Sequence, residues 1–430
     1  MRRVIASLTG ALLSTGAMAA ATPAQVVSQY AELAAIEYQD ALTRARELQN
    51  AVNALVAKPS EHTLKAARQA WLDARVPYQQ TEVFRFGNPV VDAWEGKVNA
   101  WPLDEGMIDY VDASYGNGSD MNAYYVVNVI ANNSLSIGGK KVDTREINIE
   151  LLRDTLHEAD GNEANVATGY HAIEFLLWGQ DLNGTGPAPA GRTGSPQERH
   201  AGNRPHTDFD PANCTGGHCD RRVRYLETAT SLLIKDLEDI VQAWAANGEA
   251  RNYIITDPTQ GLRAMLTGMG SLSYGELAGE RMKLGLMLHD PEEEHDCFSD
   301  NTHNSHYYNQ LGIMNVYMGS YIKTDGTTVS GASLSDLVKN LNPELDQEVR
   351  ARLDTTHQAM QALRERASTL ETYDQMIAAG NTAGNAVVQH AIDALIAQTR
   401  SLERVIVALN LGNVTIEGSD SLDSPSAVFK

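Results

Sequence analysis

The sequence predicts an all-α protein made of two helical bundles, and three observations support this prediction. Apolar residues recur at helical spacing along most of the chain, Gly- and Pro-rich segments separate these stretches, and one short helical motif occurs in both halves. With 430 residues, 43% of them hydrophobic, the chain can form two domains. We expect two pseudo-repeated domains that resemble four-helix bundles with long loops, over residues 21–248 and 249–430.

The first half opens with the clearest helical patterns. Residues 26–57 carry apolar residues at helical spacing before Pro59, and Ser60 is expected to cap a second helix that continues through Arg75. Residues 82–108 contain too many Gly and Pro breaks for one regular element and predict a shaped loop. Further helices are expected at residues 121–132, at 148–158, around His171 and at 222–246, with a Gly- and Pro-rich excursion at 183–220.

The second half follows a similar plan. Helical patterns cover residues 262–288, 345–371 and 382–409, and a polar block at 290–306 interrupts them. The segment from His171 to Leu176 matches the segment from His390 to Leu395. Ala, Ile and Leu are common in helices, so chance is one explanation, but the long spacing favours duplication of a whole bundle.

The N-terminus predicts export. Residues 1–20 contain a basic start, an apolar stretch and the small residues Ala17, Ala19 and Ala20, which together are typical of a secretory signal peptide. No cysteine stands directly after the expected cleavage point, so no lipid attachment is expected. No later segment approaches the roughly 18 apolar residues that span a bilayer. We therefore expect a periplasmic protein.

The charge narrows the class of partner. The formal net charge of −21 argues against nucleic acid or an anionic membrane, because either would need a basic face. An acidic balance attracts cations, although it can equally serve solubility. Among the three cysteines, Cys214 and Cys219 enclose two glycines and predict a short disulfide-closed loop in an oxidising compartment, which leaves Cys297 single. A metal role for the Cys214–Cys219 segment is the alternative.

One segment predicts a metal site. His171 and Glu174 stand three positions apart in the apolar run from Gly169 to Gly179, so on a helix both side chains lie on one face. An imidazole and a carboxylate suit Fe, Mn, Zn or Cu better than Ca or Mg. The alternative interpretation is a buried hydrogen-bonded pair with a structural role.

The polar block of the second half is the densest group of possible ligands. It contains His289, His295, His303 and His306 together with several acidic residues, among them Asp296 and Asp300. Turn and capping roles are the default for such a loop. We expect His295, Ser299 and His303 to face the cleft between the domains, as neighbours of the metal site or as part of a substrate surface.

Four segments together resemble the imelysin family over essentially the whole mature chain. They are Gly169-x-His171-x-x-Glu174, the stretch from Arg75 through Tyr78 to Gly87, the stretch from Asn99 to Glu105, and the stretch from His295 to His303. The resemblance implies two helical bundles with the Gly-x-His-x-x-Glu motif near their interface. It also implies two functions, since the family was named for a metallopeptidase activity and many members are described as iron-uptake proteins.

Two more ligands are expected beside His171 and Glu174. Glu82 follows Arg75 and Tyr78 at helical spacings, so the three form one polar stripe, and Asp104 lies in a loop that Trp101 can fix. The resemblance supports acidic residues at about these two places. The alternatives are a salt bridge from Glu82 to Arg75 or Arg85, and a helix-capping role for Asp104.

The sequence permits hydrolysis without indicating it. His-Glu-x-x-His, Gly-x-Ser-x-Gly and the phosphate-binding Gly-x-x-x-x-Gly-Lys motifs are absent from the sequence. We therefore expect an exported metal-binding protein for iron acquisition, with iron as the first choice of ion and zinc or copper as others. Its partners would be a metal ion or small iron-containing ligand and iron-transport components of the envelope. The alternatives are a metallopeptidase, or a binding protein for an iron chelate, haem or a polymer that contacts aromatic residues such as Trp101.

Overall fold

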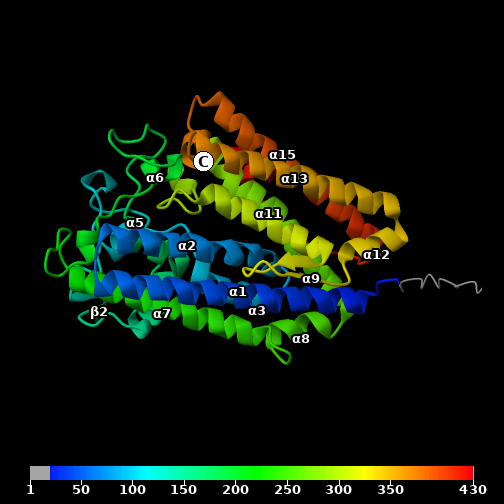
Figure 1. The fold of residues 1–430 in the computed structure, drawn as a ribbon, viewed down its shortest axis with the longest axis horizontal. Coiled ribbons are helices and arrows are strands. Elements are labelled where there is room, and N and C mark those ends of the chain that lie inside the picture. The colour runs from blue at the N-terminus through cyan, green and yellow to red at the C-terminus, as the bar shows by residue number, and fades with distance from the viewer. Residues whose placement is uncertain (1–19, 430) are drawn as a thin grey trace, which may run out of the picture.

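The structure, a computed structural model, describes residues 20–429, and these residues form an almost wholly helical protein (Figure 1). The predicted all-α class is confirmed. The α-helices are α1 Pro23–Ala57, α2 Glu61–Thr81, α3 Pro89–Asn99, α4 Glu105–Ile108, α5 Gly169–Trp178, α6 Pro196–His200, α7 Cys219–Ala243, α8 Glu249–Ile255, α9 Pro258–Ser271, α10 Leu284–Leu288, α11 Thr302–Met318, α12 Leu334–Leu341, α13 Pro343–Thr369, α14 Tyr373–Ile377, α15 Thr382–Ala408 and α16 Asp420–Asp423. Two antiparallel hairpins pair β1 Ser134–Ile137 with β2 Lys140–Asp143, and β3 Ser320–Ile322 with β4 Thr328–Ser330.

The longest helices begin where the sequence supplies caps. Thr22 caps α1 in a capping box with Gln25, and Pro23 occupies the first helical turn, where its missing N–H costs nothing. Ser60 caps α2 in the same way. Local capping interactions therefore determine the first residue of each helix, and the two helices pack against each other along their apolar faces.

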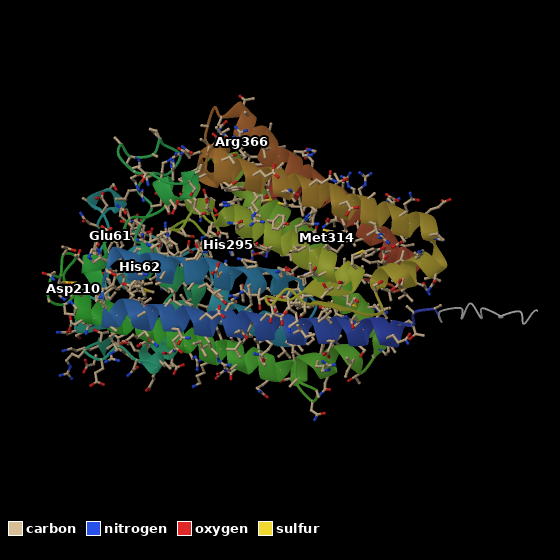
Figure 2. All side chains as sticks on the ribbon, in the orientation of Figure 1. Glu61, His62, Asp210, His295, Met314 and Arg366 are labelled. Carbon is tan, nitrogen blue, oxygen red and sulfur yellow. A yellow bond between two sulfur atoms is a disulfide. The ribbon has the colours of Figure 1, made fainter. Side chains whose placement is uncertain are left out.

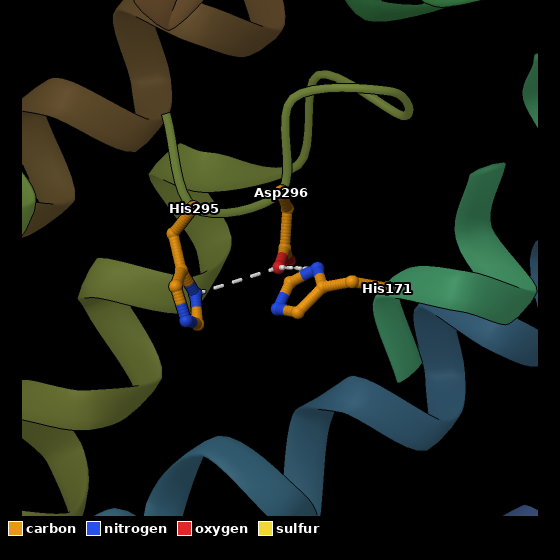
Figure 3. Close-up of side chains that lie close together, drawn as sticks. All are labelled: His171, His295 and Asp296. Atoms are coloured by element: carbon orange, nitrogen blue, oxygen red, sulfur yellow. Dashed lines mark ion pairs between the residues drawn. The ribbon is translucent and has the colours of Figure 1, made fainter. Parts of the chain in front are cut away.

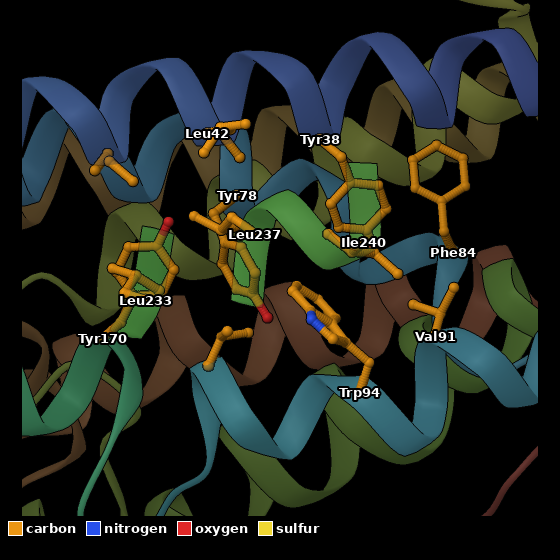
Figure 4. Packing of buried hydrophobic residues seen from close by; sticks show 14 of the residues in the cluster. Tyr38, Leu42, Tyr78, Phe84, Val91, Trp94, Tyr170, Leu233, Leu237 and Ile240 are labelled. Atoms are coloured by element: carbon orange, nitrogen blue, oxygen red, sulfur yellow. The ribbon is translucent and has the colours of Figure 1, made fainter. Parts of the chain in front are cut away.

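The helices form two layers (Figure 1). In one layer α1 packs against α2 and α7, and in the other α11, α13 and α15 run side by side. The layers meet where α2 packs on α11. Figure 4 shows the first core, in which Tyr38 and Leu42 of α1 face Leu237 of α7 and Trp94 of α3. Tyr38 and Trp94 meet edge to face, with ring centroids 5.6 Å apart.

The buried apolar residues form two clusters. The larger cluster extends from Val26 of α1 to Leu411 and includes residues on both sides of position 248. The smaller cluster joins α13 and α15 with the helix before the polar block. The domain ranges 21–248 and 249–430 and the duplication remain predictions. His390 and Asp393, which match His171 and Glu174 in sequence, are both exposed on α15.

Several predicted elements differ from the structure. Residues 82–108 contain the regular helix α3, because Pro89 fits the first turn and Asn88 caps it. Residues 121–132 form turns and no helix, and Asn122 and Asn128 bond nearby backbone there instead. Helix α11 starts inside the predicted polar block and was not expected there. Its buried face carries polar side chains such as Asn309, so the sequence shows no apolar stripe that would indicate a helix.

The helical pattern at 262–288 is confirmed as one continuous helical run with a wide segment inside it. Between α9 and α10, residues Leu272–Lys283 form a π-helix (η6) that carries Glu276 and Arg281 into the interior. A second π-helical segment, Leu151–Leu156, lies within the predicted helix at 148–158. Within residues 20–429, no helix combines the length and apolar character needed to cross a membrane. Residues 1–19 of the predicted signal peptide lie outside the described residues.

Candidate metal centre

Helix α5 places the central motif in the interior. Thr168 precedes α5, and every residue of the helix is buried. Gly169 has a φ of +80°, and a Cβ at this position would lie 2.4 Å from the carbonyl oxygen of Val98. Only glycine allows both the left-handed backbone and this close approach. The glycine of Gly-x-His-x-x-Glu therefore lets α5 start against the end of α3.

His171 and Glu174 are bonded to each other. Nδ1 of His171 lies 3.0 Å from Oε2 of Glu174, and both side chains are almost fully buried. The other oxygen of Glu174 accepts hydrogen bonds from the backbone N–H and the Oγ of Ser299, at 2.9 and 2.7 Å. Glu174 thus connects α5 to the loop between α10 and α11.

The same loop brings a second histidine and an aspartate to His171 (Figure 3). Ligand atoms of His171, His295 and Asp296 all lie within 4.8 Å of one another. Oδ1 of Asp296 is 3.6 Å from Nδ1 of His295 and 3.9 Å from Nδ1 of His171. In Figure 2, His295 lies between the two layers, whereas Asp210 and Arg366 lie at the periphery. Two imidazoles and one carboxylate therefore converge at the junction of the layers.

Arg75 of α2 is the buried cation of this centre. Its Nη2 lies 2.7 Å from Oδ1 of Asp296 and 3.4 Å from Nδ1 of His295, and its Nη1 donates to Asn99 at 2.7 Å. Its guanidinium group also lies over the ring of Tyr170, 5.0 Å from the centroid. Any cation that binds Asp296 must share this carboxylate with Arg75.

Burial sets the protonation of the two histidines. Loss of solvation, followed by the charge of Arg75, lowers the pKa of His171 to about 3. Loss of solvation, followed by the charge of Arg281, lowers the pKa of His295 well below its usual range. Both rings are therefore neutral at neutral pH, which is the form that binds metals.

The carboxyl groups respond to burial in opposite ways. Burial and then the charge of Asp296 raise the pKa of Glu174 well above its usual range. Burial also acts to raise the pKa of Asp296, but Arg75 and His171 outweigh it and lower that pKa. Asp296 is therefore the carboxylate that stays ionised in the centre.

One atom of His171 remains free. A neutral imidazole has one N–H, and when Nδ1 donates to Glu174 the lone pair is on Nε2. Nε2 is buried and has no hydrogen-bond partner among the described residues. A carboxyl group hydrogen-bonded to one nitrogen of a histidine commonly supports metal binding at the other nitrogen. The donor set of His171, His295 and Asp296 therefore fits a transition metal ion.

Glu82 lies in a different buried pair. Its Oε2 is 2.8 Å from Nη2 of Arg281, which also contacts Glu276 at 2.7 Å. Arg85 lies nearby with Nη1 3.5 Å from Glu95. The structure thus pairs Glu82 with an arginine of η6 and does not include it in the group of converging ligands. Its role as a ligand stays a prediction.

Asp104 lines a cavity next to Trp101. It is half-buried and accepts a hydrogen bond from Asn122, and the cavity, of about 530 Å³, is also lined by Glu105 and Asp181. Trp101 packs edge to face on His295, with ring centroids 5.8 Å apart. Asp104 is also outside the converging group, and its ligand role stays a prediction.

Tyr78 and His303 are buried, and two of the three cysteines are paired. Tyr78 packs against Tyr170 at 4.7 Å, and its buried hydroxyl has no partner among the described residues. His303 is buried at the start of α11, with Nε2 3.0 Å from Asn304. Cys214 and Cys219 are joined by a disulfide at the start of α7, and Cys297 is free.

The ligand role of Asp296 and its pairing with Arg75 are what sequence reasoning missed. The sequence places Asp296 only among the acidic residues of the polar block, and it offers Arg75, with Tyr78, Arg85 and Trp101, as a neighbour of the site or, alternatively, as a salt-bridge partner of Glu82. The adjacency of Asp296 to His295 was the available signal. The partnership of Arg75 with Asp296 joins residues 221 positions apart, so no local pattern could indicate it.

Comparisons with known proteins agree with the fold. The model of the family described as Imelysin matches residues 34–402. Iron-regulated protein A of Synechococcus elongatus is 22% identical over 383 residues, which cover 86% of this chain and 82% of that protein. A solved structure of a putative iron-regulated protein A precursor from Parabacteroides distasonis has a TM-score of 0.62 at 18% identity, covering 91% of this chain and 97% of that one. An imelysin-like protein from Psychrobacter arcticum has a TM-score of 0.54 at 16% identity, with coverages of 91% and 98%.

Proposed function

Because the chain belongs to the imelysin family, we propose that it is an exported protein that binds iron or a similar transition metal ion at a buried centre and serves metal acquisition. The ligands would be His171, His295 and Asp296. Glu174 would orient His171 from the other side of its ring. The similarity to an iron-regulated protein supports an iron-related role, and the acidic charge of the whole chain would favour the approach of a cation.

The observation that carries this proposal is the convergence of His171, whose buried Nε2 has no partner among the described residues, with a second imidazole and an ionised carboxylate. A buried polar atom without a partner costs about 1–3 kcal/mol. A metal ion at Nε2 would remove that cost. Two imidazoles and one carboxylate are a donor set that suits Fe(II) and also Zn(II).

The burial of the centre favours an ion over a peptide as its ligand. His171, Glu174 and Asp296 are each no more than 1% exposed, so a polypeptide would reach them only after a large rearrangement. A zinc peptidase instead keeps an open position for water and substrate. Binding of an ion is therefore the function that the geometry supports best.

The test is the metal content of protein purified from the periplasm without chelators. Wild type would be compared with His171→Gln and His295→Gln by elemental analysis and by titration with Fe(II) and Zn(II). We expect iron in wild type and loss of stoichiometric metal in both variants. Crystals soaked with iron should show anomalous scattering between His171 and His295.

His390→Gln is the matched control, because His390 occupies the corresponding place in the second copy of the motif and is exposed. It should bind metal like wild type. Equal metal content in all four proteins would overturn the proposal. Chelator-sensitive cleavage of an unfolded protein that is lost with His171→Gln would favour the metallopeptidase instead.

A further inference from the structure

A second group of carboxylates lies beyond the first centre. Ligand oxygens of Asp181, Asp300 and Asp374 all lie within 4.8 Å of one another. Asp181 follows α5, Asp300 belongs to the loop before α11, and Asp374 belongs to α14. Three segments far apart in sequence therefore place their carboxylates together, and none of the three residues belongs to the proposed centre at His171.

Two of the three carboxyl groups have an oxygen atom that lacks a hydrogen-bond partner among the described residues. Oδ2 of Asp300 and Oδ2 of Asp374 are buried and have no hydrogen-bond partner among the described residues, and each residue is 1% exposed. Asp181 is better satisfied, since its Oδ1 accepts from the backbone N–H of Asn183 at 2.9 Å. The unpartnered oxygens are the sign that a ligand belongs here, because buried polar atoms are normally paired.

The surrounding charges do not balance this group. Both oxygens of Glu294, also buried, lack partners in the described chain. The nearby cation is Arg192, whose hydrogen bonds go to the backbone carbonyls of His200 and Ala201, at 3.4 and 2.8 Å. Within residues 20–429, Arg192 makes no ion pair with any of the three aspartates. The three clustered carboxylates therefore have no ion-pair partner in the described chain.

The acid groups respond to this crowding. Burial and then the charges of Asp374 and Asp181 raise the pKa of Asp300 well above its usual range. Burial raises the pKa of Asp374 to about 7 and that of Asp181 to about 6. Without a cation the group can stay buried only by holding protons, whereas a divalent cation would let all three ionise.

We propose that Asp181, Asp300 and Asp374 form a calcium site. All three donors are hard oxygens, which calcium and magnesium prefer over softer metals. Three protein carboxylates favour calcium, because magnesium usually keeps its waters and takes one or two carboxylates. Thioether, thiolate and imidazole donors, which would favour iron, zinc or copper, are not among these three ligands.

The site has a clear structural consequence. Asp300 lies in the same loop as His295, Asp296 and Ser299, and Asp181 follows the helix that carries His171. Calcium would therefore tie the end of α5 to this loop and to α14. This consequence concerns the shape of the loop, so the calcium site stands whether or not the His171 centre binds iron.

The test is titration of the chelator-treated full-length protein with calcium chloride, followed by calorimetry and by thermal unfolding with calcium or with EDTA. We expect one calcium-binding event that raises the unfolding temperature of wild type. Asp300→Asn and Asp374→Asn should each weaken calcium binding at least about tenfold. In EDTA the same variants should unfold at the wild-type temperature or above it, because each replaces a buried acid that must hold a proton with an amide that is always neutral.

Two controls make the result decisive. Asp393→Asn removes an exposed carboxylate of α15 and should leave calcium binding unchanged. His171→Gln should also retain calcium binding, which separates this site from the proposed iron centre. The proposal is overturned if wild type binds no calcium, if the two asparagine variants bind it as wild type does, or if they unfold earlier than wild type in EDTA and gain as much from calcium.

Discussion

Oε2 of Glu174 lies 3.0 Å from Nδ1 of His171, and this short contact holds the imidazole with its other nitrogen free. The sequence motif suggested that both side chains would bind one ion. We infer different roles for them, because Nδ1 of His171 is engaged by Glu174, whereas its Nε2 has no partner among the described residues. Glu174 is thereby a positioning residue for His171, held in turn by two hydrogen bonds from Ser299.

Glu174→Gln tests this positioning role. Glutamine keeps the size of the side chain and can still accept from Ser299 through its carbonyl oxygen, but it offers an amide N–H₂ to His171 in place of the carboxyl oxygen. We expect metal affinity to fall by about 10- to 100-fold, as for other outer partners of metal-binding histidines. Calorimetric titration with Fe(II) and Zn(II) measures the change. Asp393→Asn, at the exposed matching position, should have no effect, and unchanged affinity in Glu174→Gln would contradict the assigned role.

Arg75→Met tests the buried ion pair with Asp296. Removing one partner of a buried pair leaves an uncompensated charge and typically costs about 3–5 kcal/mol of unfolding free energy. Arg75 and Asp296 are each at most 1% exposed, so this range applies, and urea unfolding of metal-free protein measures it. Excess metal should restore more stability to Arg75→Met than to wild type, because a bound cation would replace the guanidinium charge.

The control for Arg75→Met is the double variant Arg75→Met with Asp296→Asn. It removes both charges, so it should regain most of the lost stability in the absence of metal. It should also gain nothing from added metal, since a ligand is gone. A double variant as unstable as Arg75→Met alone would show that packing on Tyr170, and not charge, determines the effect.

Gly169→Ala tests why the motif begins with glycine. The substitution combines a positive φ of +80° with a Cβ that would lie 2.4 Å from the carbonyl oxygen of Val98. Gly116→Ala is the matched comparison, because Gly116 has a φ of +92° with nothing within 4 Å of the added Cβ. Gly116→Ala should cost about 1–3 kcal/mol for the strained backbone alone. Gly169→Ala should cost clearly more in urea unfolding, and equal losses would contradict the close-approach explanation.

The sequence predicted the fold where each helix carries its own signal. Helices α1, α2, α7, α13 and α15 have apolar stripes, caps or a following Pro, and their observed bounds lie within a few residues of those predicted. Helix α11 escaped prediction because its buried surface includes amides that bond other helices, for example Asn309 with Gln79. Such partners come from distant positions, so the helix shows no stripe.

The site residues likewise fall into those that a local sequence pattern indicates and those that only tertiary packing brings together. His171 and Glu174 were identifiable because a helix places them on one face within one turn. His295 was identifiable as part of a dense polar block. The convergence of His171 with Asp296 and Arg75 depends on how α2, α5 and the loop before α11 pack together, and this is a tertiary relationship that spacing along the chain does not encode.

Acidification should destabilise the protein because its buried histidines are neutral in the folded state. The contribution of one of them, His306, can be measured separately. Burial, followed by the charge of Arg281, lowers the pKa of His306 to about 3, and neither ring nitrogen has a partner in the described chain. The unfolded chain takes up a proton on this ring below about pH 6.5, while the folded ring stays neutral until about pH 3. A lowered pKa gives stability that is complete above the unfolded value and is lost as the pH falls toward the folded value.

His306→Phe removes this titration and keeps a ring against Tyr373, whose centroid lies 5.1 Å away. The free energy of unfolding, measured in urea at fixed pH values between about 6.5 and 4.5, should therefore fall less steeply in the variant. The slope should differ from that of wild type by up to about 1.4 kcal/mol per pH unit. At neutral pH the variant should be at least as stable, because two unpartnered buried nitrogens are gone. His62→Phe, on the exposed face of α2, controls for loss of a histidine as such, and parallel slopes in wild type and His306→Phe would refute the assigned protonation.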